Sequence, residues 1–251
     1  MKINSLILFA ALLPQTVLAV DAQATLQWSQ RVELTTPVAG VVQTVSVDIG
    51  DTVKKGQVLL TLDSTIYQAA VAASQAAISR LSAEGLEAKR EFDRVHELYA
   101  RSVVSTSELD SAKLRLTKAE SMLAEARATM RQQQKMLDDT SLRAPFDAVV
   151  IDRKAEIGTS IGTALHPQIL FVLAKSGEML ARLQLLATQL ERLKAGQSVA
   201  VIVDGKNYDG KIKSVGLEPS KQKDDTSYQV DVLFMSKLQM RSALPATVRL
   251  P

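Results

Sequence analysis

The sequence predicts an elongated α+β protein, in which a long helical hairpin divides one small β domain and a second β-rich region follows. Three observations support this prediction. One segment of the chain occurs twice in similar form. Residues 64–138, between the two copies, have helical periodicity, and residues 176–251 contain several short apolar runs.

The N-terminus has the pattern of a secretory signal peptide over residues 1–19. Lys2 precedes an apolar run at residues 6–13, and Ala19 ends a small-residue cleavage site. A retained transmembrane anchor is the alternative, but the apolar run is short and Pro14 ends it. The chain has no cysteine, which excludes disulfides and an anchor on an acylated cysteine. We therefore expect a secreted chain without a lipid anchor.

The internal repeat relates residues 37–62 to residues 145–170 at a constant shift of 108 positions, with no gap. The matching positions are Pro37 with Pro145, Val41-Val42 with Val149-Val150, Ile49-Gly50 with Ile157-Gly158, Val53 with Ile161, and Leu62 with Leu170. Two matching β-rich halves are expected to pair into one domain, so the segment between them must leave that domain and return.

Each copy resembles one half of a biotinyl/lipoyl domain. A lipoyl-like domain that is divided by a helical hairpin is typical of periplasmic adaptor subunits, the membrane fusion proteins of the HlyD/RND-adaptor family, which act in tripartite efflux systems. The resemblance implies a split lipoyl-like domain from residues 37–63 and 143–173, with a hairpin at residues 64–138.

The hairpin segment contains no proline, and its apolar or small residues recur at alternating steps of four and three. This heptad pattern predicts an antiparallel coiled coil with Leu81, Leu116 and Leu123 in the seam between the arms. At 1.5 Å per residue each arm is roughly 50 Å long. Ser105 and Glu108 form the pattern of a capping box, so the second helix is expected to begin near Thr106.

The expected tip of the hairpin carries Arg94, Leu98 and Ser105 in the spacing R-x3-L-x6-S. In the adaptor family, which this chain resembles, that pattern docks a TolC-type outer-membrane channel. Arginine offers a fork of donors to carbonyls or carboxylates, leucine an apolar contact, and serine room for close approach. The alternative is that Arg94 is a solvated charge, Leu98 flanks the seam and Ser105 is only a helix cap.

Residues 176–251 are expected to form strands at 180–185, 199–203, 211–215, 228–234 and 247–250, with a short helix at 187–194 and a polar connection at 218–227. Residues 24–34 are expected to add the opening strand. The phrase L-x-x-L-x-x-G-Q at residues 190–197 resembles the small β-barrel of the adaptor family. Residues 240–245 lack the glycine that the family often has before its last strand. The resemblance also implies a short adaptor of three domains, without a membrane-proximal domain.

The composition argues against several other functions. The net charge of +3 comes from 30 basic and 27 acidic residues without a basic cluster, which disfavours a nucleic-acid partner. The two histidines, His96 and His166, are far apart and belong to no acidic cluster, so neither a metal site nor a catalytic triad is expected. Lys54 and Lys55 do not occupy the turn that would carry biotin or lipoate. We expect no cofactor and no enzyme activity.

The sequence is therefore interpreted as a periplasmic adaptor that links an inner-membrane transporter, of RND type, to an outer-membrane channel. The resemblance implies self-association into a ring and attachment to the inner membrane through the transporter. The alternatives are a biotin or lipoate carrier domain, an adaptor of an ABC-type exporter, and a coiled-coil protein without a role in transport. The exported substrate, the transporter's identity and the stoichiometry stay open.

Overall fold

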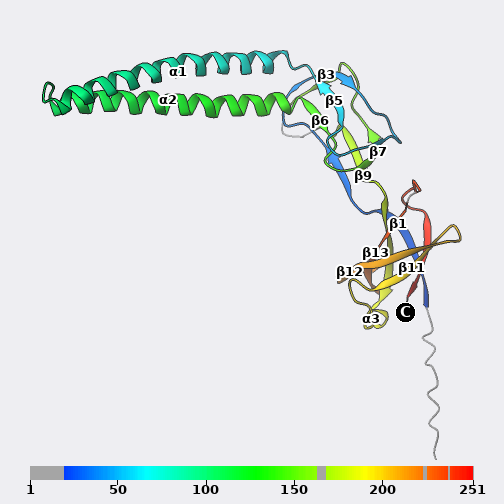
Figure 1. Cartoon of the computed structure of the whole chain (residues 1–251). Coiled ribbons are helices and arrows are strands. Elements are labelled where there is room, and N and C mark those ends of the chain that lie inside the picture. Colours follow the sequence, from blue (N-terminus) through cyan, green and yellow to red (C-terminus); the bar gives the residue numbers. More distant parts are fainter. Residues whose placement is uncertain (1–19, 163–167, 223–224, 237, 251) are drawn as a thin grey trace, which may run out of the picture. The chain divides into compact units, whose positions relative to one another are not determined.

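The computed structural model describes residues 20–162, 168–222, 225–236 and 238–250, which form two compact units (Figure 1). One unit comprises Arg31–Ala174, and the other combines residues 20–30 with residues 175–250. The expected signal peptide at residues 1–19, and His166, lie outside the described residues.

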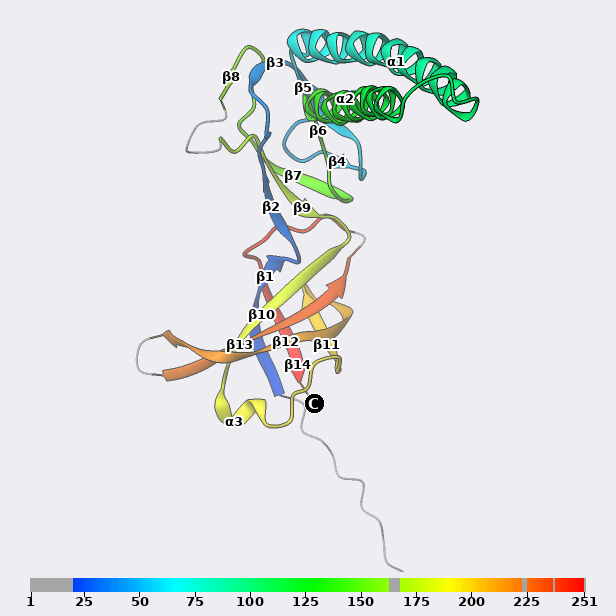
Figure 2. The same ribbon diagram turned by 90° about the vertical axis from the view of Figure 1, so that its left-hand side faces the viewer.

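The unit Arg31–Ala174 contains two four-stranded sheets (Figure 2). The first has the order β2-β9-β7-β4, with β2 at Arg31–Leu34, β9 at Phe171–Lys175, β7 at Ala148–Arg153 and β4 at Thr52–Val53. The second has the order β6-β5-β3-β8, with β6 at Ser141–Arg143, β5 at Val58–Leu62, β3 at Gly40–Val45 and β8 at Ser160–Ile161.

The two copies of the repeat pair with each other, as the sequence predicts. Shifting β3 by 108 positions gives the bounds of β7, and the same shift converts β4 into β8. Each copy places one strand in the other copy's sheet, because β4 pairs with β7 and β8 pairs with β3. Gly50 and Gly158 occupy equivalent turns with φ of 93° and 87°, a conformation that favours glycine. The core between the sheets includes Leu59, Leu62 and Phe171.

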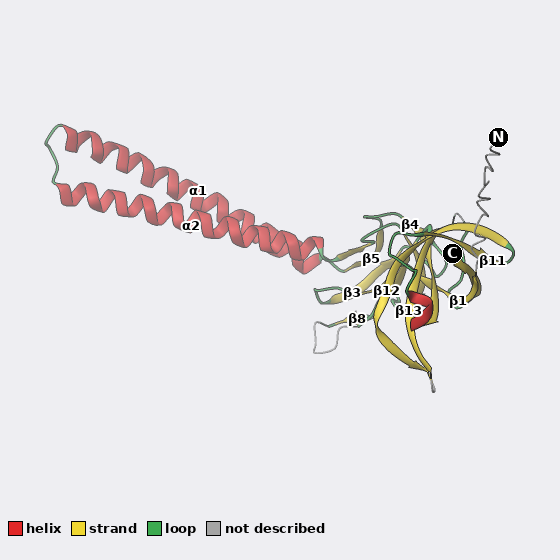
Figure 3. Ribbon diagram, turned by 90° about the horizontal axis from the view of Figure 1, so that it is seen from below, coloured by secondary structure: helices red, strands yellow, loops and turns green. Residues whose placement is uncertain are grey.

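The helical insert leaves the second sheet after β5 and returns before β6. It consists of α1, Thr65–Ala100, and α2, Thr106–Asp138, which lie side by side and run antiparallel (Figures 1 and 3). Backbone bonds join the two ends of the insert to the sheet: the Leu62 amide donates to the Thr140 carbonyl at 2.8 Å. The Tyr67 hydroxyl donates to the Ala39 carbonyl at 2.6 Å.

Only three residues of the two long helices are buried, namely Val95, Ala112 and Ala126. The expected seam residues Leu81, Leu116 and Leu123 are half-buried. Small residues at the contact let two helices approach closely, and this also limits the apolar area that they bury.

The second unit is a closed six-stranded barrel in the order β1-β10-β13-β12-β11-β14. Its strands are β1 Val20–Trp28, β10 Glu178–Leu186, β11 Ser198–Val203, β12 Lys206–Gln222, β13 Asp225–Met235 and β14 Pro245–Leu250, and the short helix α3 is Ala187–Leu190. Alternate residues such as Leu183, Val201 and Phe234 fill the interior, because side chains alternate across a strand.

Two expectations about this region are wrong. Residues 31–34, which were expected in the barrel, form β2 and pair with β9, because a bend at Ser29 interrupts the run and the strand changes sheets there. The polar connection expected at 218–227 belongs largely to the strands, since β12 and β13 continue their pairing as far as Gln222 and Asp225. The sequence of this segment has few apolar residues and no alternation of apolar and polar residues, so a hydrophobicity pattern does not predict a strand there.

None of the helices in the described residues is both long and apolar enough to span a membrane.

Candidate functional site: the tip of the helical hairpin

Helix α1 ends in a Schellman motif that directs the chain into the tip loop. The Val103 amide donates to the Leu98 carbonyl at 3.0 Å, and the Ser102 amide donates to the Tyr99 carbonyl at 2.9 Å. This motif needs a left-handed residue after the cap, and Ser102 supplies it with φ of 56°. A serine in this conformation is under mild strain, because left-handed backbone favours glycine.

Helix α2 begins with the capping box that the sequence predicts. The Glu108 amide donates to the Ser105 Oγ at 3.3 Å, and the Ser105 amide donates to the Glu108 Oε2 at 2.8 Å. The Ser105 amide, and then its hydroxyl, lower the pKa of the Glu108 carboxyl by stabilising its charged form. The loop of residues 101–105 is therefore fixed at both ends by local hydrogen bonds.

Arg94 is already engaged within its own helix. Its Nη2 and Nε donate to the two carboxylate oxygens of Glu91 at 2.7 Å and 3.0 Å. The hydrogen bond from Arg94 lowers the pKa of Glu91, and the same contact raises the pKa of Arg94. The guanidinium fork that was expected to face a partner is thus occupied by Glu91, and the Arg94 side chain is 62% exposed.

The three residues of the sequence pattern occupy different settings at the tip. Arg94 is exposed, Leu98 is half-buried one helical turn later, and Ser105 is exposed as the residue before α2. Two further residues of the tip lie outside the sequence pattern. Glu91 could have been found from its spacing of three residues before Arg94, which places opposite charges on one helix face. Val103, which is 65% exposed in the tip loop, carries no signal beyond its apolar character.

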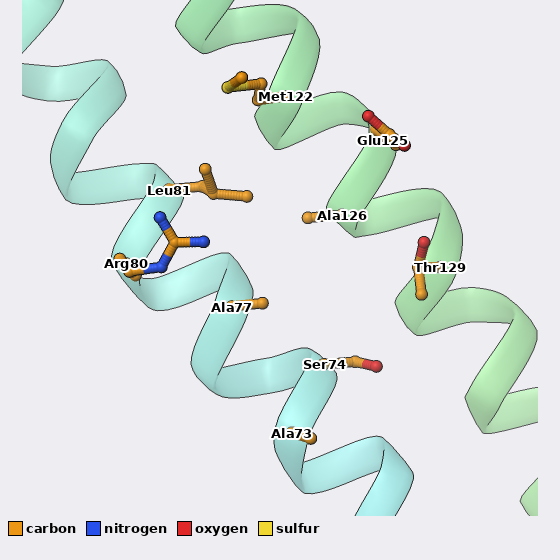
Figure 4. A pocket seen from close by; sticks show the side chains of 9 residues that line it. All are labelled: Ala73, Ser74, Ala77, Arg80, Leu81, Met122, Glu125, Ala126 and Thr129. Carbon is orange, nitrogen blue, oxygen red and sulfur yellow. The ribbon is translucent and has the colours of Figure 1, made fainter.

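A second feature of the hairpin is an open groove of about 500 Å³ between α1 and α2 (Figure 4). Leu81 of α1 points across it toward Ala126 of α2, and Arg80 lies at its edge. Arg80 is paired with Glu84 of the same helix at 2.6 Å. The lining is completed by Ala73, Ser74, Ala77, Met122, Glu125 and Thr129.

The described residues contain no group of three or more potential metal ligands. Lys54 and Lys55 are exposed, and the Lys54 Nζ lies 4.0 Å from the Asp147 carboxylate. Where a carrier domain would have its lysine turn, β5 ends at Leu62 and α1 begins at Thr65.

Comparison with known proteins agrees with this architecture. A family model described as a CzcB-like barrel-sandwich hybrid domain matches residues 30–174. The chain is 27% identical over 216 residues to the macrolide export protein MacA of Yersinia pestis. This match covers 79% of this chain and 58% of MacA. It is also 27% identical over 190 residues to protein YdhJ of Escherichia coli K12, covering 75% of this chain and 65% of YdhJ.

Among solved structures, the membrane fusion protein Spr0693 of Streptococcus pneumoniae R6 has a similar fold. The TM-score is 0.73 at 16% sequence identity, and the match covers 92% of this chain and 98% of that protein. At this identity the likeness concerns the fold. The chain spans 58% and 65% of the length of MacA and YdhJ.

Proposed function

Because the chain belongs to the family of proteins with a CzcB-like barrel-sandwich hybrid domain, we propose that it is a periplasmic adaptor subunit of a tripartite efflux system. In this function it links an inner-membrane transporter to a TolC-type outer-membrane channel, through which small molecules leave the cell. The protein acts by binding its partners, and the transporter supplies the energy.

The observation that carries this proposal is the position of the helical insert. Two long helices replace the turn at which a carrier domain would bear its modified lysine, so the β domain supports the helices. We assign residues 37–63 and 143–173 to a lipoyl-like domain and residues 64–138 to a coiled-coil hairpin. Residues 176–251, with the strand that begins the described chain, form the barrel domain.

The tip is the proposed docking surface for the outer-membrane channel. Leu98 and Val103 offer apolar contacts, and Ser105 is the N-cap residue of α2. Arg94 can bind a partner carbonyl through its third nitrogen, while Glu91 holds the guanidinium in place. A guanidinium held in this way loses little conformational entropy when it binds.

The transporter is proposed to be of RND type, and an ABC-type exporter is the alternative. MacA, to which this chain is similar, is a macrolide export protein, which supports export of small molecules as the function of the complete pump. Residues 1–19 would direct the chain to the periplasm as a cleavable signal peptide. There it would attach to the inner membrane through the transporter and assemble with further copies into a ring.

Cross-linking in cells tests the proposal, and the absence of cysteine from the chain makes the experiment simple. Arg101→Cys places the chain's only thiol in the exposed tip loop, where a heterobifunctional maleimide–photoactivatable reagent is attached. The expected product is a conjugate with an outer-membrane channel protein, identified by mass spectrometry. Lys194→Cys, exposed in the barrel unit, is the matched control and should give no channel conjugate. Equal yields of channel conjugate from both sites, or none from either, would contradict the proposed docking.

The intact mass of the purified protein separates this function from a biotin or lipoate carrier. An adaptor has the mass of its polypeptide alone. A stable mass increase of one biotin or lipoate on a lysine would favour the carrier.

A further inference from the structure

A small cavity lies in the barrel unit. It has a volume of about 280 Å³ and lies between the β11–β12 turn and the segment that precedes β14. Its lining includes Asp204, Lys206, Tyr208, Met240, Arg241 and Leu244.

The walls of the cavity are held by two local conformations. The β11–β12 hairpin turns through Asp204 and Gly205, both with positive φ, 48° and 74°, as a two-residue type I′ turn requires. On the opposite side, Ala243 has φ of 65°, and its amide donates to the Leu26 carbonyl at 2.8 Å. The β11–β12 turn and the segment before β14 are therefore tied to the barrel by regular backbone structure.

The lining divides into an apolar part and a basic part. Met240 and Leu244 are half-buried against the barrel core, and the Tyr208 ring lies 5.4 Å from the Phe234 ring. Lys206 and Arg241 are exposed at the edge. Neither of these cations, nor the Tyr208 hydroxyl, forms a hydrogen bond or ion pair with another described residue. With Asp204 as the acidic member, the lining carries a net positive charge.

We infer that this cavity binds a small amphiphilic anion, with its acidic group on Lys206 and Arg241 and its apolar part on Met240 and Leu244. Two cations and a phenolic hydroxyl suit a carboxylate or phosphate, to which charge-assisted hydrogen bonds are strong. The volume is slightly below the range of about 300–1,000 Å³ typical of pockets for drug-sized ligands, so a short chain fits better than a large molecule. This site is independent of the proposed function, since it requires neither transporter nor channel.

Sodium octanoate is the probe for the test, titrated into the ¹⁵N-labelled purified chain and followed by NMR. Saturable shifts are expected at the amides of Gly205, Lys206, Tyr208 and Met240. Octylammonium, which has the opposite charge, and inorganic phosphate, which has no alkyl group, should bind more weakly than octanoate. Octylammonium or phosphate that binds as tightly as octanoate would overturn the inference.

The double substitution Lys206→Gln with Arg241→Gln should weaken octanoate binding about tenfold or more, because each removes a charged hydrogen-bond donor. The control pair Arg192→Gln with Lys194→Gln makes the same change of charge at the other end of β11 and should bind octanoate like the wild type. An unchanged affinity in the first pair, or an equal loss in both pairs, would overturn the assignment.

Two sources can supply such an anion, a free acid or a lipid headgroup. Vesicles of phosphatidylglycerol, compared with vesicles of phosphatidylcholine, distinguish them. Binding to the anionic vesicles that octanoate inhibits would assign the site to a lipid surface. Octanoate binding without vesicle binding would assign it to a free acid, and binding of neither would refute the site.

Discussion

The two long helices and the β-barrel are stabilised in different ways. The barrel encloses a continuous core that includes Leu26, Leu183, Val201, Val232 and Phe234, all buried. The helices α1 and α2 comprise 36 and 33 residues, but only Val95, Ala112 and Ala126 among them are buried. The helices therefore depend more on local features, such as the caps at the tip and the i,i+4 pairs Arg80–Glu84 and Lys89–Asp93.

The hairpin tip and the cooperative core therefore belong to separate regions: α1 and α2 carry the tip, and the barrel contains the core. A helix pair with a narrow seam can open locally at its far end without loss of the β structure. A closed barrel with one core is expected to unfold as a unit. Two probes separate the regions. Trp28, the only tryptophan, packs against the barrel core and reports on that unit, while helical circular dichroism reports mainly on α1 and α2.

The largest effect is expected in the barrel core. Phe234→Ala removes a ring that is 1% exposed and leaves a cavity, which should cost about 3–5 kcal/mol of unfolding free energy. Urea denaturation followed by Trp28 fluorescence measures the loss. Leu217→Ala, at a position that is 93% exposed, is the control and should change stability by less than about 0.5 kcal/mol. If Phe234→Ala lowered the urea midpoint of the helical circular dichroism as much as that of Trp28 fluorescence, the two regions would not be separate.

The helix seam should be less sensitive. Leu81→Asp places a carboxylate at a half-buried position in the groove between α1 and α2 and should cost about 2 kcal/mol, measured as a lower midpoint of the helical transition. Leu116→Asp and Leu123→Asp should behave alike. The control is Leu114→Asp, because Leu114 is 70% exposed on α2. If Leu81→Asp and Leu114→Asp have the same effect, the seam is assigned to the wrong residues.

Substitutions at the tip should weaken binding much more than stability, because the loss of an exposed ion pair such as Arg94–Glu91 costs only about 0.5 kcal/mol. Leu98→Ser removes the proposed apolar anchor, and Arg94→Asp reverses a charge beside Glu91; each should weaken docking by about 2 kcal/mol, roughly thirtyfold. Export and the yield of channel conjugate are the measurements, with transporter binding as the readout that should not change. Ser105→Asp keeps a capping group but enlarges the contact. It therefore distinguishes a docking role from a capping role. Normal export in all three variants would show that the tip does not dock the channel and that the hairpin acts only as a spacer.

The sequence predicted most of the β domain that carries the hairpin, because its repeat is directly visible. The shift of 108 positions that relates the two copies also relates the bounds of β3 and β7. The sequence also predicted the capping box at Ser105, since that motif depends on residues three positions apart. It failed where structure depends on distant partners. The strand at residues 31–34 follows the barrel strand in sequence, but its hydrogen bonds are made with β9, about 140 positions later.

Two structural details at the tip, one of a side chain and one of the backbone, also could not be predicted from the pattern R-x3-L-x6-S. The pattern does not include Glu91, so the occupied guanidinium of Arg94 was missed. The left-handed conformation of Ser102 was missed because serine has no strong preference for it, and glycine would have been the usual signal. The same reason applies to Ala243 in the barrel, at the turn for which the sequence lacks the expected glycine.

The smallest expected effect compares these two left-handed residues, one in each region. Ser102→Gly and Ala243→Gly both relieve strain, since a left-handed conformation costs an L-residue about 1–2 kcal/mol, but glycine also gains entropy when unfolded. Each should therefore stabilise its own region by about 0.5–1 kcal/mol. Ser102 lies in a loop whose hydrogen bonds are made with the end of α1. Ser102→Gly should therefore slow amide exchange only near that end of the helix. Ala243→Gly should instead raise the barrel's midpoint in the Trp28 transition. If Ser102→Gly shifted the Trp28 transition as much as Ala243→Gly does, the hairpin and the barrel would form one cooperative unit.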